Sequence, residues 1–144
     1  GLGALVVDNP DIRYFFGKIT MYPHLDRTAR DLILHFLKTW FPDPDHLVEP
    51  FSPLLPVTDP GLLREAFGGE DYEADYKALV QRVRGLGEGI PPLVNAYMNL
   101  SRTMRFFGTS LNDHFGDVEE SAILVTIADI HDSKMERHVF SYQK

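Results

Sequence analysis

The chain has 144 residues, of which 44% are hydrophobic and 24% are charged, an ordinary composition for one globular domain with its own core. The net charge of −7 argues against a nucleic-acid-binding protein, because such proteins usually present a basic face. The absence of cysteine excludes both a disulfide scaffold and a thiolate nucleophile.

No targeting or membrane-spanning segment is visible. No apolar run approaches the ~20 residues that cross a bilayer, and the first residues lack a basic region followed by an apolar one. We therefore expect a cytoplasmic location, with peripheral attachment to the inner membrane surface left open.

Residues 1–7 read as the end of a helix without an N-cap. This start predicts a fragment of a longer protein, and a processed N-terminus is the alternative.

The first predicted strand covers residues 12–22, which are rich in aromatic and β-branched side chains. Its apolar residues fall on both faces, which predicts a central strand covered on both sides. Gly17 inside this strand indicates a bulge or a close approach of another backbone.

The clearest amphipathic helix follows, from its N-cap Asp26 to Trp40. Its apolar residues recur three and four apart. We expect Ile33, Phe36, Leu37 and Trp40 to be buried against the strand 12–22.

A proline-rich stretch, residues 42–60, predicts an extended strap that lies across the domain, since its aliphatic residues are too apolar for free solvent. Asp59-Pro60 then begins a short helix, and a further helix covers about 71–85. Pro91-Pro92 opens another short helix, for which we predict an apolar face of Leu93, Ala96, Tyr97 and Leu100. Two strands, 104–111 and 122–128, are joined by a turn around Gly116-Asp117, and a terminal helix covers 132–142.

The order of several short motifs resembles bacterial GNAT-like proteins that are often labelled "hemolysin", a group similar to the ornithine- and glycine-lipid N-acyltransferases. The matching residues are Pro91, Pro92, Leu93, Tyr97, Leu100, Asp113 and Phe115. Met98 stands where leucine is usual, Ser101 replaces a glycine, and the spacing from the acid to the phenylalanine is shorter. The match extends back over 12–22 and 28–40, so it covers most of the chain.

The resemblance implies an α/β fold with a GNAT-like mixed sheet flanked by helices, of which this chain is a C-terminal fragment. We expect a single domain over 1–144. Its first part, 1–41, holds the end of the central helix, a strand and a helix. The proline-rich strap and helical insert cover 42–101, and the closing β-hairpin and terminal helix cover 102–144.

The resemblance also implies an N-acyltransferase that moves a fatty acyl group from acyl-carrier protein, or acyl-CoA, to a small amine such as an amino acid in aminolipid synthesis. The loop that binds the donor's phosphates would lie upstream of residue 1. We therefore expect this chain alone to bind no cofactor and to be inactive, and the full-length protein to be the enzyme. Nothing in the residues supports pore formation.

Such a transferase needs a base to deprotonate the incoming ammonium group. Asp113, Glu119 and Glu120 bracket the last turn, and we select Asp113 and Glu120, although all three would also suit an ordinary turn. Tyr97 is a candidate general acid or hydrogen-bond donor; the alternative is a core aromatic residue whose hydroxyl group reaches solvent. Candidate substrate-binding residues are Pro92, Asn95, Phe107 and Phe115.

Three further expectations complete the sequence-based account. The six histidines form no metal signature, so we expect no metal site. A chain that begins inside a sheet leaves an unpaired strand edge, which predicts a homodimer. A non-enzymatic binding module remains the alternative function, and an α/β domain of another role is the third.

Overall fold

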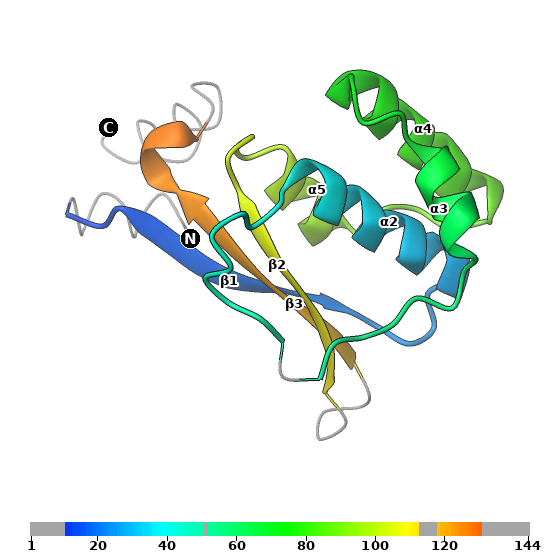
Figure 1. Ribbon diagram of the computed structural model, residues 1–144, viewed down its shortest axis with the longest axis horizontal. Coiled ribbons are helices and arrows are strands. Elements are labelled where there is room, and N and C mark those ends of the chain that lie inside the picture. Colours follow the sequence, from blue (N-terminus) through cyan, green and yellow to red (C-terminus); the bar gives the residue numbers. More distant parts are fainter. Residues whose placement is uncertain (1–10, 51, 113–117, 131–144) are drawn as a thin grey trace.

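The computed structural model describes residues 11–50, 52–112 and 118–130, which form a sheet with helices gathered on one side of it (Figure 1). The elements, in chain order, are β1 (Tyr14–Met21), α2 (Arg27–Trp40), α3 (Pro60–Ala66), α4 (Tyr72–Gly85), α5 (Pro92–Met98), β2 (Arg105–Asn112), β3 (Val118–Thr126) and the 3₁₀ turn η1 (Ile127–Asp129). The α/β class is thus confirmed. The expected helix end at 1–7, the turn at 116–117 and the helix at 132–142 lie outside the described residues.

The described sheet has the order β1-β3-β2, and both pairings are antiparallel. β3 is therefore the central strand of the described sheet. Among the described residues β1 lies at the edge with one face uncovered, so the prediction of a strand covered on both sides at 12–22 is wrong. Alternate residues of β1 face the helices, whereas Tyr14 and Phe16 on the other face are 58% and 59% exposed. The prediction failed because these aromatic residues gave the sequence of β1 an apolar pattern on both faces, as in a strand that is covered on both sides. Phe16 instead stacks on Phe107 of β2, with the ring centroids 6.1 Å apart.

The two glycines of the sheet have different roles. The pairing of β1 with β3 is unbroken from Tyr14 to Met21, so Gly17 does not form a bulge. Gly17 is approached by a side chain and not by another backbone: the Tyr97 hydroxyl lies 3.3 Å from the position that a Cβ on Gly17 would occupy. The register shift is in β2, between Phe106 and Thr109, where Gly108 has a φ of +103°.

Helix α2 forms as its pattern predicts. The Asp26 side chain accepts a hydrogen bond of 3.0 Å from Ala29 N, the expected N-cap. Ile33, Phe36 and Leu37 are completely buried.

Trp40 departs from the prediction, because it is half-buried and contacts α4. Its ring packs edge-on against Tyr72, with centroids 5.4 Å apart, and its indole N–H donates to Asp75 at 3.0 Å. The buried carboxylate of Asp75 supplies the acceptor that a partly buried indole N–H needs.

Helix α5 begins at the two prolines as expected, and its buried face is only partly the predicted one, because Leu100 is buried and Tyr97 is half-buried against the core. Leu93 and Ala96 are exposed, whereas Val94 and Met98 are almost fully buried. A helix of seven residues has too few turns for its own periodicity to determine which side packs inward.

Residues 42–50 and 52–58 form the expected strap, which runs along the edge of β2 between the end of α2 and the start of α3 (Figure 1). Pro53 pairs with Ser110 in an isolated bridge, and Leu54 N donates to Thr109 O at 2.8 Å. Contrary to expectation, several of its apolar side chains remain in solvent, and Leu55 is 76% exposed. Backbone hydrogen bonds, more than apolar burial, hold this strap in place.

Candidate functional site

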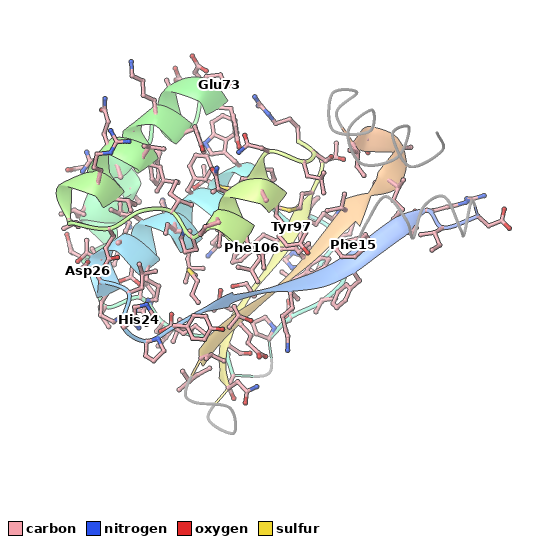
Figure 2. All side chains as sticks on the ribbon, turned by 180° about the vertical axis from the view of Figure 1, so that it is seen from behind. Phe15, His24, Asp26, Glu73, Tyr97 and Phe106 are labelled. Carbon is pink, nitrogen blue, oxygen red and sulfur yellow. The ribbon has the colours of Figure 1, made fainter. Side chains whose placement is uncertain are left out.

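The structure places the predicted site residues Tyr97 and Glu120 on opposite sides of the sheet. Tyr97 projects from α5 onto the covered face, where its ring stacks on Phe15 with centroids 6.2 Å apart (Figure 2). Glu120 pairs in register with Thr20, which belongs to the other face of β1. Asp113 and Phe115 lie outside the described residues.

Glu120 is held by neighbouring polar groups. Lys18 Nζ lies 3.1 Å from its Oε1, and Asn112 Nδ2 donates to the same oxygen at 3.3 Å. These contacts, with the Lys18 hydrogen bond as the largest cause, lower the pKa of the Glu120 carboxyl group. A carboxylate with a lowered pKa is a weaker base at neutral pH.

The other predicted residues of α5 have separate environments. Burial raises the pKa of Tyr97, so its phenol is protonated at neutral pH and can donate a hydrogen bond. Asn95 Oδ1 accepts a hydrogen bond from the hydroxyl of Tyr76 on α4, which connects it to the helical layer. Pro92 is exposed at the start of the helix.

Phe107, the remaining predicted residue, lines a cavity of about 500 Å³ between α2, the strap and β2. Most of the lining is aliphatic, proline or aromatic, and includes Leu34, Val48, Pro53, Leu54, Phe106 and Phe107. Asp31, His35, Lys38 and Asp43 are among its polar groups. The cavity can therefore accept an apolar group and offers charged or hydrogen-bonding side chains beside it.

The strap is fastened beside this cavity at its first turn and near its middle. Arg105 Nη1 lies 2.6 Å from Asp45 Oδ2 and 3.4 Å from Asp43 Oδ1. Pro50 packs against Gly108, where a Cβ would lie 3.1 Å from Pro50 Cγ. A glycine at this position, with its positive φ, lets the strap lie close to β2.

A buried group of charges lies between α2 and the sheet. Arg30 Nη1 donates to Glu119 Oε1 at 3.0 Å, and Arg30 Nη2 donates to Asp31 Oδ1 at 2.9 Å. Arg27 also contacts Glu119 Oε1. Within the part of the chain that the structure describes, Glu119 Oε2 is the one buried side-chain nitrogen or oxygen without a hydrogen-bond partner.

This buried group of charges is hard to predict from the sequence. Asp31 and Arg30 are polar positions of an amphipathic helix and would ordinarily face solvent. The sequence identifies Glu119 only as an acid beside a turn. The available signal was alternation in β3, since Glu119 shares the parity of the buried residues Ser121, Ile123 and Val125.

His35 lies on α2 at the cavity and stacks on Phe67, with ring centroids 6.0 Å apart. Burial, with smaller contributions from Lys38 and Arg64, lowers the pKa of its imidazole. The ring is therefore neutral at neutral pH.

Two properties of the described residues bear on the class of site. Residues 11–50, 52–112 and 118–130 contain no group of three or more metal-ligating side chains. The helices in these same ranges are all too short or too polar to cross a bilayer.

Two curated relatives match essentially the whole chain. A protein of Phocaeicola vulgatus named glycine N(alpha)-acyltransferase is 51% identical over 144 residues, which are 100% of this chain and 44% of the relative. A protein of Bacteroides thetaiotaomicron with the same name is 51% identical over 142 residues, which are 99% of this chain and 42% of the relative. The chain thus spans less than half the length of these relatives. The similarity supports an acyltransferase family.

No protein-family model matches the chain. No solved structure matches it either.

Proposed function

We propose that this chain is part of an N-acyltransferase that transfers a fatty acyl group to the amino group of glycine. The observation that carries this proposal is the 51% identity, across the whole chain, to two proteins whose names state that activity. The acyl-carrier protein donor and a role in aminolipid synthesis are the finer parts of the proposal, and they rest on the family resemblance.

The cavity beside the strap supports an acyl substrate. Its volume of about 500 Å³ lies within the ~300–1,000 Å³ range of small-molecule sites. Its mainly apolar lining suits a hydrocarbon chain, which gains free energy when it leaves water. We assign the acyl chain of the donor to this cavity.

The chemistry requires two protons to leave the glycine nitrogen: one is removed from the ammonium group before attack, and the other is lost from the tetrahedral adduct and ends on the leaving sulfur. The amine nitrogen attacks the thioester carbonyl carbon, a C–N bond forms, and the C–S bond breaks to release a thiolate. A carboxylate base takes the ammonium proton, and we propose Asp113 or Glu120 for this role. Because Glu120 lies on the opposite side of the sheet from Tyr97, these two residues are alternatives and do not act on one substrate together. Tyr97, whose phenol is protonated, is proposed as the hydrogen-bond donor to the leaving thiolate.

The two carboxylates can be tested separately. Asp113→Asn or Glu120→Gln is expected to lower turnover by the ~10²–10⁴ typical of a general base, whichever residue holds the role. For Glu120, the contact with Lys18 lowers the pKa of the carboxyl group and so makes the carboxylate a weaker base. Full turnover in both variants would remove both residues from the mechanism.

The activity itself is tested with the full-length protein, palmitoyl-acyl-carrier protein or palmitoyl-CoA as donor, and glycine or ornithine as acceptor. Mass spectrometry should detect N-palmitoylglycine. The 144-residue chain alone is expected to give no product, because the family resemblance puts the donor's phosphate-binding loop upstream of residue 1. Release of free palmitate without N-acylated product would contradict an N-acyltransferase, and binding of palmitate without transfer would favour a binding module.

A further inference from the structure

Asp31 connects the cavity to the strap. Its side chain is 2% exposed and lies in the cavity wall. Its Oδ2 accepts three hydrogen bonds from the strap: Val57 N at 2.9 Å, Thr58 N at 2.9 Å and Thr58 Oγ1 at 2.7 Å. One buried carboxylate oxygen therefore holds the end of the strap to helix α2.

The other oxygen of Asp31 is fixed by Arg30. Arg30 Nε and Nη2 both donate to Asp31 Oδ1, at 3.0 and 2.9 Å. Arg30 is itself held by Glu119 of the central strand. Because charge-assisted hydrogen bonds are short and directional, this chain of contacts fixes the orientation in which Asp31 presents Oδ2 to the strap.

Few other contacts hold this end of the strap. Leu55 and Val57 are exposed, so they bury little apolar surface. The opposite end relies on the ion pairs of Arg105, and the partner Asp45 is solvent-exposed, which makes such a pair weak. The segment 55–58 thus depends on Asp31 more than on packing.

We propose that Asp31 is a positioning residue that holds the strap against the cavity and thereby sets the affinity of the cavity for an aliphatic chain. The inference rests on the proposed function, in which the cavity takes the acyl group. Loss of the Asp31 contact would let the strap wall at Pro56, beside the segment that Asp31 holds, move away from the acyl chain, so the bound acyl group would lose apolar contacts.

The test acts on the strap, because removal of Asp31 would take from the buried Arg30 one of its two carboxylate partners. Thr58→Val deletes the hydroxyl donor and keeps the shape, whereas Thr58→Ser keeps the hydroxyl. Thr39→Val is the matched control, since the Thr39 hydroxyl donates to His35 O at 2.8 Å on exposed α2 surface. Each variant is made in the full-length protein, and palmitate affinity is measured by calorimetry.

Thr58→Val is expected to weaken palmitate binding by about three- to tenfold, the effect of one lost hydrogen bond. Thr58→Ser and Thr39→Val should bind as the wild type does. In the transfer assay, Thr58→Val should raise the KM for the acyl donor and leave kcat unchanged. Unaltered binding by Thr58→Val, equal weakening by Thr39→Val, or no palmitate binding by the wild type would overturn the inference.

The two proposals fail in different ways. If the wild type binds palmitate but makes no N-palmitoylglycine, the proposed reaction is contradicted. The affinity ratio of Thr58→Val to Thr58→Ser then still decides the role of Asp31.

Discussion

Gly108 shows how one residue without a side chain allows the strap to approach the sheet. Its φ of +103° and the nearby Pro50 leave little room for a Cβ. We expect Gly108→Ala to lower the free energy of unfolding by about 1–3 kcal/mol, because an L side chain is strained at this φ. Gly85→Ala is the control, since Gly85 ends α4 and a Cβ there meets open space. It should raise stability by about 0.4–1 kcal/mol. Equal effects of both variants in urea unfolding would contradict this account.

Glu119 and Glu120 are neighbours in sequence with opposite environments. Glu119 is buried with Arg27 and Arg30, whereas the Glu120 pair with Lys18 is at the surface. Glu119→Ala should cost about 1.5–3 kcal/mol, because the buried Arg30 loses one of its two carboxylate partners. Glu120→Ala should cost less than about 1 kcal/mol. Chemical denaturation measures the free energy of unfolding of both variants. A larger loss of stability for Glu120→Ala than for Glu119→Ala would show that the buried and exposed faces of β3 are assigned the wrong way round.

At the scale of elements, local sequence signals were sufficient to predict where the described helices begin. The caps Asp26, Asp59 and Asp71 each accept hydrogen bonds from the first turn of their helix. The sequence predicted the Asp26 cap, the helix start at Asp59-Pro60 and a helix that begins near residue 71. The order of the strands could not be predicted in this way, because β3 becomes central only through pairings with residues a hundred positions away. Alternation alone cannot tell an exposed aromatic face from a covered one.

The packing of α2 gives the sharpest test of the helical layer. Phe36 is completely buried and contacts the rings of Phe67, Tyr72 and Tyr76. Phe36→Ala should cost about 3–5 kcal/mol of unfolding free energy. Leu93→Ala serves as the control, because Leu93 is 52% exposed on α5 and its loss should cost under about 1 kcal/mol. If Leu93→Ala were the more damaging change in thermal or urea unfolding, the assigned face of α5 would be wrong.

At the scale of the whole molecule, the candidate site was the part that the sequence predicted least well. Phe107 and the strap were both anticipated, but the cavity arises only where the strap, α2 and β2 meet. Asp31 and Glu119 look like ordinary surface charges until these long-range contacts bury them. The predicted pair Tyr97 and Glu120 is instead divided by the sheet itself.

The central claim is that the protein acylates glycine and holds the acyl chain in this cavity. The most direct measurement is the kcat/KM for palmitoyl transfer to glycine by the full-length protein and by Leu54→Trp, which places a large ring at the cavity wall. Leu55→Trp is the matched control, because the neighbouring side chain is exposed. We predict that Leu54→Trp lowers palmitoyl transfer about tenfold or more by overpacking the cavity, while transfer of a butanoyl group and the control remain near wild type. Palmitoyl transfer by Leu54→Trp at the wild-type rate, or no N-acylglycine from the wild type, would contradict the claim.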